Sequence, residues 1–375
     1  MKVIAFYTND LDNRGPCYLS SKNKLDYIFS VFNSVKEKFS VLSLCTESKK
    51  RQCACKKNEG ICHVYYMSAY PRDNIRLKLS HLFFDSIKTF FFLLKNIERG
   101  EVIYLYHSTA YHGIIKLIKR IKKFRMILEV EEIYGDVSKD EKLKKKEKSF
   151  FRYADAFVFP TELLNKKVNT ENRPSAIIYG TYHVEEEINN NSFDDSESIV
   201  HCVYAGTLDQ RKGGALAAIL SAEFLPENYH LHILGFGSAK DKEEITEQIR
   251  KVSEKTKAKV TYEGVLSGDD YIGFLQRCDI GLSTQNPEAD FNDTSFPSKI
   301  LSYLSNGLRV VTVKIPVVEM SAIGDLCTYY EKQDPKEIAD AILYAGRERD
   351  VDCRKRIRDL SVEFENEILK LLKAI

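Results

Sequence analysis

The stretch from Val203 to Gly214, VYAGTLDQRKGG, decides the fold prediction. An apolar run ends in a glycine turn, two adjacent cations follow, and two more glycines open a helical pattern over 216–224. In such a strand–turn–helix junction the glycines let the backbone approach a ligand, while the helix N-terminus and the cations attract an anion. The stretch therefore predicts a phosphate-binding corner of an α/β domain, although an ordinary structural corner would share the pattern.

A second junction of this kind lies at 295–313, SFPSKILSYLSNGLRVVTV. The spacing predicts a helix from about Pro297 to Asn306, capped by Ser295 or Asp293, and a β-branched strand directly after it. The chain thus offers a second helix N-terminus able to face an anion.

Strand and helix patterns alternate along the whole chain. In the first half, strands are predicted at 2–7, 40–45, 61–66, 101–106, 125–131, 156–159 and 175–179, and helices at 21–38, 74–97, 110–122, 140–152 and 161–168. In the second half, strands are predicted at 199–205, 229–235, 258–263, 279–283, 309–314 and 326–330, and helices at 213–223, 240–255, 268–276, 297–306, 335–346 and 354–374. This alternation is typical of α/β proteins with parallel, doubly wound sheets, and predicts two Rossmann-like domains facing a central cleft.

The acidic, Asn- and Ser-rich segment 185–198 has little to bury and is expected to link the two domains. We therefore expect an N-terminal domain over 1–184, a C-terminal domain over 199–350 and a final helical segment over 351–375.

Composition excludes several classes of protein. The chain has 375 residues, 43% of them hydrophobic, and a net charge of +2, which fits a globular protein and argues against a broad nucleic-acid-binding surface. The start, MKVIAFYTND, predicts a strand rather than a secretory signal, and the nine scattered cysteines suggest a reducing cytosol.

Two segments invite special interpretations. Cys53, Cys55, Cys62 and His63 could hold zinc, but their spacing is not that of a standard finger, so a cysteine-bearing surface loop is favoured. The apolar stretch 81–94 is interrupted by charges, and a buried amphipathic helix is favoured over a membrane helix.

These motifs resemble those of the retaining, GT-B-fold glycosyltransferases of family 4, especially enzymes that make bacterial surface polysaccharides such as capsule or lipopolysaccharide. The family pattern G-R-L-x-x-x-K-G is matched by GTLDQRKG, which begins at Gly206, and Lys212 falls on the family's diphosphate-binding lysine. Thr207 replaces the usual arginine, whose charge Arg211 could supply instead. The glycine pair that follows a strand in the family appears here with Gly235 as its first member.

The resemblance departs from the family at two acidic positions. Many members carry two glutamates eight residues apart, which contact the donor sugar and the ribose; here they align with Thr294 and Ser302. A minor branch of the family has F-P-S-K-I at this place, as here. The resemblance implies that the donor is bound by Gly206, Thr207, Gly235, Thr294, Ser295, Phe296, Pro297, Ser298, Lys299 and Ser302.

In the first domain, the strand ending LEVEEIY places three carboxylates at a position where the family has a cleft-facing histidine or acid. Alternation with Val130 favours Glu132 over Glu131 as the catalytic group, although a solvated acidic strand end is an equal alternative. Arg14 and Gly15 follow the first strand, where the family has a loop near the acceptor and the diphosphate; a structural turn is again an equal alternative.

The resemblance implies transfer of a sugar from a nucleotide-diphosphate sugar to a glycan or lipid-linked acceptor, with retention at the anomeric carbon. Lys212, Arg211 and Lys299 would stabilise the departing diphosphate, so neither a metal nor another cofactor is expected. Two alternatives remain: a GT-B-fold sugar-nucleotide epimerase, and a catalytically inactive binding subunit.

Two basic segments, Lys116–Arg125 and Lys142–Lys148, are either solvated helix faces or contacts to anionic lipid headgroups. The expected location is the cytoplasm, at the inner face of the membrane if these segments bind lipid. No nucleic-acid partner is expected.

Overall fold

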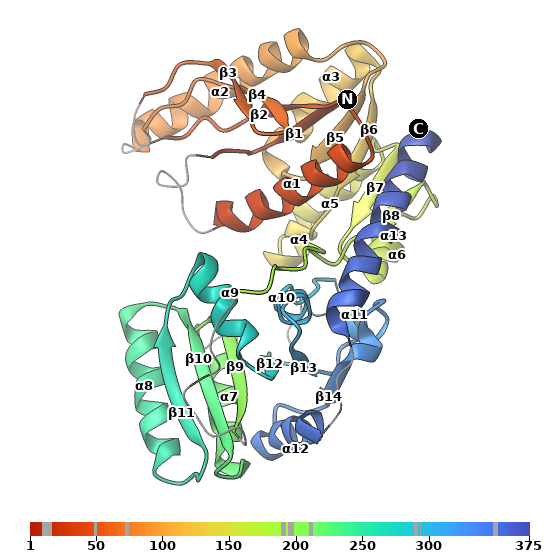
Figure 1. Ribbon diagram of the computed structural model, residues 1–375. Helices are drawn as coiled ribbons and strands as arrows, with labels where there is room; N and C mark the ends of the chain where they lie inside the picture. Colours follow the sequence, from red (N-terminus) through yellow and green to blue (C-terminus); the bar gives the residue numbers. More distant parts are fainter. Residues whose placement is uncertain are drawn as a thin grey trace. The chain divides into compact units, whose positions relative to one another are not determined.

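The computed structural model describes residues 1–9, 17–48, 51–71, 75–188, 193, 199–209, 213–288, 292, 294–347 and 352–375, with side chains starting at 21 and 84 in the two helices that begin at 17 and 75. The chain divides into two compact units. Unit 1 comprises Met1–Thr181 together with Val362–Ile375, and unit 2 comprises Tyr182–Ser361 (Figure 1).

The described residues of unit 1 form an eight-stranded sheet in the order β3-β4-β2-β1-β5-β6-β7-β8. Neighbouring strands are parallel, except that β3 and β4 form an antiparallel hairpin. The strands are β1 Lys2–Ala5, β2 Ser40–Ser43, β3 Cys55–Glu59, β4 Cys62–Tyr66, β5 Val102–Tyr106, β6 Arg125–Glu129, β7 Ala156–Phe159 and β8 Ser175–Ile177. The helices are α1 Cys17–Ser34, α2 Ile75–Asn96, α3 His112–Lys122, α4 Tyr134–Val137, α5 Glu141–Phe151 and α6 Glu162–Val168.

The described residues of unit 2 form a six-stranded, fully parallel sheet in the order β11-β10-β9-β12-β13-β14. Its strands are β9 Val200–Thr207, β10 Tyr229–Phe236, β11 Lys259–Gly264, β12 Ile280–Ser283, β13 Arg309–Val313 and β14 Cys327–Tyr330. Its helices are α7 Gly214–Ser221, α8 Ala239–Ser253, α9 Gly268–Gln276, α10 Lys299–Ser305, α11 Pro316–Glu319 and α12 Pro335–Arg347.

The central strands of both sheets are buried on their two faces, which is why they read as continuous apolar runs. Ile127 and Leu128 are neighbours in β6 and point to opposite faces, yet neither is exposed to solvent; the same holds for Val310 and Val311 in β13. The predicted α/β fold of two Rossmann-like domains is therefore confirmed.

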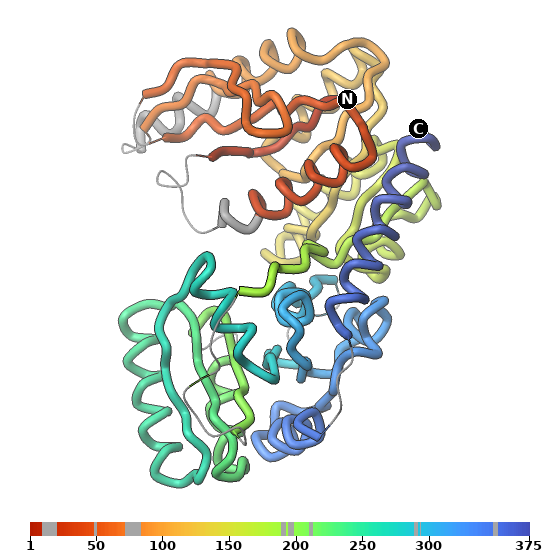
Figure 2. The backbone as a smooth tube through the Cα atoms, in the orientation of Figure 1, coloured from red at the N-terminus to blue at the C-terminus, as the bar shows by residue number. Residues whose placement is uncertain are grey.

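The helix α13, Cys353–Ala374, begins in unit 2 and ends in unit 1. Figure 2 traces this return of the chain to unit 1. Within unit 1, the Phe364 ring stacks on Tyr27, and the Glu367 carboxylate accepts a hydrogen bond of 3.2 Å from the Ile177 amide. The C-terminal residues are thus a structural part of the N-terminal unit.

One short strand and two short α-helices were not predicted, and each lacks the pattern on which prediction relies. Strand β3 is almost wholly exposed and polar, so it shows no apolar alternation, whereas a surface loop was expected there. Helices α4 and α11 have four residues each, which is too short for a helical period to be read.

The expectation of a buried helix at 81–94 was wrong for one of its faces. Helix α2 buries Asp85, Thr89 and Leu93, which lie four residues apart on one side. Phe84 and Phe91 are 57% and 62% exposed, because the sheet can cover only one stripe of the helix.

Candidate functional site

The strand order of unit 2 reverses between β9 and β12, so the carboxyl ends of these strands form a topological switch point. In open parallel sheets, ligands bind at such points. Gly206 lies next to last in β9 and is paired with Gly235 of β10. A side chain on Gly235 would collide with the carbonyl oxygen of Gly206, so both strands can run this close only because position 235 carries a glycine.

Lys299 brings a positive charge to the same point. Its ammonium nitrogen lies 3.9 Å from the centre of the Tyr204 ring. A Cβ atom on Gly206 would lie only 2.9 Å from the same nitrogen, so the ammonium is directly beside Gly206. The Tyr204 hydroxyl donates a hydrogen bond of 3.0 Å to the Thr207 carbonyl, which fixes the ring that supports the cation. A cation–π contact of this kind holds the lysine ammonium in place.

Helix α7 begins beside this cation. Gly213, its N-cap, has a φ of +67°, a left-handed conformation that favours glycine. A side chain on Gly214 would collide with the carbonyl oxygen of Thr284, just beyond β12, and the Thr284 hydroxyl donates to the Gly214 carbonyl at 2.7 Å. The first turn of α7 therefore packs closely against the carboxyl end of β12, at the switch point.

Together, Gly206, Thr207, Gly213, Gly214 and Lys299 form what we call the glycine–lysine corner. It combines accessible backbone with one fixed cation at a strand end and a helix start. This chemistry suits a phosphate or diphosphate group.

Arg211 and Lys212, the two cations predicted to bind diphosphate, lie outside the described residues, as does Asp293. Arg14 and Gly15, the predicted acceptor loop, also lie outside them. Their roles therefore remain predictions.

The segment before α10 differs in detail from its prediction. The helix begins at Lys299 rather than about Pro297, and its N-cap is Ser298, whose side chain makes no capping hydrogen bond. Ser295 is therefore not the cap, because Pro297 and Ser298 still precede the first helical residue. Thr294, Ser295 and Pro297 are partly exposed, and Phe296 is buried.

Ser302, the predicted ribose contact, lies one turn into α10. It is partly exposed, and its hydroxyl lies near Tyr271 of α9, whose pKa it acts to lower while burial raises it. Neither this partner nor Tyr204 was predicted from the sequence, because an aromatic residue in an apolar segment reads only as core.

Unit 1 places a group of buried charges at the end of β6. Glu129 is fully buried and accepts a hydrogen bond of 2.8 Å from the Tyr104 hydroxyl. The ammonium of Lys24, on α1, lies 2.9 Å from a Glu131 carboxylate oxygen and 3.7 Å from one of Glu129. Burial raises the pKa of Glu129 to about 8, with Lys24 acting to lower it and Glu131 to raise it.

Glu132, the predicted catalytic residue, lies beyond the end of β6 at Glu129. The strand alternation used to favour it over Glu131 therefore does not apply, because the chain has already left the sheet. Burial, followed by the Glu131 charge, raises the pKa of Glu132, whereas Glu131 is paired with Lys24. The surroundings of Glu132 therefore favour its protonated form.

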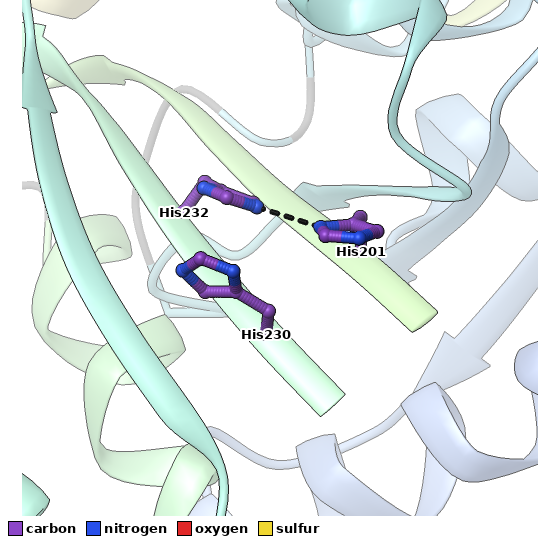
Figure 3. A group of neighbouring side chains, drawn as sticks. All are labelled: His201, His230 and His232. Carbon is purple, nitrogen blue, oxygen red and sulfur yellow. Dashed lines mark hydrogen bonds between the residues drawn. The ribbon is translucent and has the colours of Figure 1, made fainter. Parts of the chain in front are cut away.

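The four residues considered as zinc ligands, for which a surface loop was favoured, are not gathered around one point. In the hairpin, Cys55 pairs with Tyr66 and Cys62 with Glu59, so the two cysteines lie at opposite ends of the strands. Among the described residues, the group with ligand atoms close enough for one ion is His201, His230 and His232 (Figure 3). The H-x-H pattern at 230–232 is the sequence signal that could have revealed it.

In unit 2, residues 200–346 match the profile of the family described as glycosyl transferases group 1. No sequence among curated proteins matches the chain significantly.

Solved structures resemble the chain over its whole length at low sequence identity. The sucrose-phosphate synthase of Thermosynechococcus elongatus has a TM-score of 0.64 at 10% identity, over 100% of this chain and 99% of that one. The α,α-trehalose-phosphate synthase (UDP-forming) of Burkholderia xenovorans, in complex with glucose-6-phosphate, has a TM-score of 0.60 at 10% identity, over 98% and 96%. Anabaena HepE, in complex with UDP and glucose, has a TM-score of 0.63 at 12% identity, over 100% and 99%. The chain therefore has the two-domain GT-B fold, and its residues 200–346 carry the sequence profile of the glycosyl transferases group 1.

Proposed function

We propose that this protein is a retaining glycosyltransferase that moves a sugar from a nucleotide-diphosphate sugar to a saccharide or lipid-linked acceptor. The observation that carries the proposal is the Lys299 ammonium beside Gly206, within the part of the chain that matches the glycosyl transferases group 1. Anabaena HepE with UDP and glucose and the UDP-forming trehalose-phosphate synthase, which share the fold, support a nucleotide donor.

In the proposed reaction, the bond between the anomeric carbon and the diphosphate oxygen breaks, and a bond from the acceptor oxygen to the same face of that carbon forms. The acceptor proton passes to the departing diphosphate, so no separate base is required. The chief task of the protein is to stabilise the negative charge that grows on the leaving group.

The glycine–lysine corner is suited to that task. Lys299 contributes a full charge, and the backbone at Gly206 and Gly213–Gly214 lets a diphosphate approach closely. We further propose that Lys212 and Arg211 add cations to this corner. A charge-assisted hydrogen bond contributes about 1.5–3 kcal/mol, so each such contact is expected to change affinity tens-fold.

We propose that the donor sugar and ribose meet neutral groups at Thr294 and Ser302. Hydroxyls can bond the sugar hydroxyls, but each bond contributes only about 0.5–1.5 kcal/mol. Donor affinity is therefore expected to depend mainly on the diphosphate.

For the acceptor, we propose Glu132 of unit 1. A carboxyl with a raised pKa can orient an acceptor hydroxyl or share its proton. The neighbouring Lys24–Glu129–Glu131 group would hold the end of β6 rigid.

We also propose that unit 1 rests on an anionic membrane at the cytoplasmic face. On α3, Leu117 and Ile121 are each 47% exposed and lie one turn apart, with the exposed Arg120 between them and Lys123 just after the helix. Helix α2 packs against α3 and exposes Phe84 and Phe91. An apolar stripe flanked by cations is typical of a helix lying in the lipid interface.

Not all of the predicted basic segments are available to lipid. Lys119 is paired with Asp155, and Lys144 with Asp136. Exposed cations remain on α5 at Lys142, Lys145, Lys146 and Lys148. No helix in the described part of the chain is both long and apolar enough to span a bilayer.

Calorimetry with UDP and GDP tests the nucleotide site. Lys299→Ala is expected to weaken binding of the nucleotide tens-fold, whereas Lys242→Ala, an exposed lysine of α8, leaves it unchanged. Equal affinity in Lys299→Ala and the parent protein would overturn the assignment. Product analysis then separates the alternatives: transfer to an added acceptor supports the proposal, an isomerised donor indicates an epimerase, and binding without turnover indicates an inactive subunit.

Flotation with phosphatidylglycerol vesicles tests the membrane face. Leu117→Ser with Ile121→Ser should abolish flotation, while Ile61→Ser with Val265→Ser, equally exposed apolar positions elsewhere, should preserve it. If both double variants lose flotation, or if both still float, α3 is not the membrane-binding face.

A further inference from the structure

Three histidines converge on one face of the unit 2 sheet. His201 lies opposite His230 in the pairing of β9 with β10, and His232 follows two residues later on the same face. Their exposed fractions are 6%, 6% and 2%, and one ring nitrogen from each lies within 4.8 Å of the others. Figure 3 shows the three rings grouped around a common point.

The ring nitrogens of two of them already meet. His201 Nδ1 and His232 Nε2 are 3.0 Å apart (Figure 3). Two imidazole ligands of a tetrahedral ion with Zn–N bonds of about 2.0–2.1 Å have nitrogens roughly 3.3 Å apart. Replacing the shared proton with a metal ion would therefore need only a small separation of the rings.

The other nitrogen of His232 is held by a carboxylate. His232 Nδ1 lies 2.8 Å from Glu263 Oε1 on β11. A carboxylate on the far nitrogen fixes the tautomer of a metal-binding histidine and increases the basicity of its ligand nitrogen. The arrangement leaves Nε2 of His232 directed at His201.

His230 has one ring nitrogen without a hydrogen-bond partner. Its Nε2 lies 2.8 Å from the Thr261 hydroxyl, whereas its Nδ1 is buried and has no hydrogen-bond partner. Buried polar atoms nearly always have a partner, so this atom calls for one. A metal ion between the rings would supply it.

A pocket adjoins Glu263, the carboxylate partner of His232. The pocket, of about 370 Å³, is lined by Glu263, Asp269, Asp270, Gly273, Phe274 and Arg277, among others. Its acidic side chains attract a cation, and Glu263 belongs both to the pocket and to the histidine network.

We propose that His201, His230 and His232 bind one Zn²⁺ ion, with Glu263 orienting His232 and water completing the coordination. Imidazole is a preferred ligand of Zn²⁺, and three neutral nitrogen ligands with an open fourth position form a coherent site. The site is distinct from the glycine–lysine corner: His201 precedes Gly206 in β9 by five residues, or about 17 Å of strand. Its expected effect is to tie β9, β10 and β11 together.

The test uses the full chain, freed of metal by a chelator and titrated with Zn²⁺ by calorimetry. We expect one ion per chain and a higher unfolding temperature with Zn²⁺. His232→Gln should lower the affinity at least 100-fold, and Glu263→Gln about 10–100-fold. His183→Ala, at an exposed histidine outside the cluster, should leave it unchanged.

Two further measurements distinguish the histidine site from a cysteine site and from a loss of folding. With Co²⁺, an all-histidine site gives visible d–d absorption without thiolate charge-transfer bands, so Cys53→Ser with Cys55→Ser should preserve the spectrum. Circular dichroism checks that each variant is folded, and Glu263→Gln serves as a second variant because its side chain is 28% exposed rather than buried in the core. Absence of stoichiometric Zn²⁺ binding, binding unaffected by both His232→Gln and Glu263→Gln, or binding lost in the cysteine variant would overturn the proposal.

Discussion

The two sheets carry opposite chemistry at the carboxyl ends of strands β9 and β6. At the carboxyl end of β9, unit 2 has closely packed glycines and the Lys299 ammonium. At the carboxyl end of β6, unit 1 has a fully buried Glu129 held by Lys24 and Tyr104. Parallel α/β topology fixes where a ligand can bind, and the side chains at the strand ends decide which ligand it is.

The difference extends to stability. In unit 1 the cation balances buried carboxylates, so the group is chiefly structural. In unit 2 the Lys299 ammonium lies over the Tyr204 ring beside Gly206, where we propose that it contacts the diphosphate. Substitutions should therefore affect folding in unit 1 and binding in unit 2.

Removing the buried cation of unit 1 should have the largest effect. Lys24→Met leaves Glu129 and Glu131 without their partner, and breaking a buried ion pair costs about 3–5 kcal/mol of unfolding free energy. Denaturant unfolding of this variant and of Lys38→Ala, an exposed lysine nearby, measures the difference. Equal stability of the two variants would show that the unit 1 group is not structural.

In unit 2, the backbone contact at the strand end can be broken without touching a charge. Gly235→Ala sets a methyl group against the Gly206 carbonyl and should cost about 1–3 kcal/mol of stability and weaken nucleotide binding. Gly113→Ala, a helical glycine with open space around it, is the control and should be neutral or slightly stabilising. Tight nucleotide binding by Gly235→Ala would show that the ligand site does not depend on the close approach of β9 and β10.

The pH dependence of stability offers a finer distinction. Glu129 has a pKa of about 8 in the fold, above its ordinary value of 4.5, so the folded state holds the proton more tightly than the unfolded state. Its contribution to stability is therefore full at low pH and declines as the pH rises toward 8, by at most about 1.4 kcal/mol per pH unit.

Denaturant unfolding between pH 5 and pH 8 tests this, with Glu129→Gln as the comparison that removes the titrating group. The parent protein should lose stability with rising pH more steeply than Glu129→Gln. Parallel pH profiles would mean that Glu129 does not titrate as its burial implies.

The smallest effect is expected at the ribose position. Ser302→Ala removes one neutral hydrogen bond and should weaken nucleotide binding by about 0.5–1.5 kcal/mol. Ser302→Glu restores the commoner family residue and should preserve or tighten binding of UDP or GDP, as measured by calorimetry. A folded Ser302→Glu protein that binds neither nucleotide would show that Ser302 does not occupy the ribose position.

The sequence by itself determined the alternation of strands and helices, the two sheets and the location of the glycine–lysine corner. These follow from local patterns: apolar runs, glycine at turns and caps, and helical spacing. Helix α9 was predicted with the bounds that the structure has, Gly268–Gln276, because an acidic first turn and an apolar period mark it.

Only the tertiary structure decided which side chains meet. Lys299 and Tyr204 are far apart in sequence, and so are Lys24 and Glu129. No local sequence pattern predicts either contact. The three histidines lie on two neighbouring strands, and their convergence depends on the register of β9 with β10. Periodicity reports which face a residue takes within its own element, whereas strand order and register decide its neighbours from other elements.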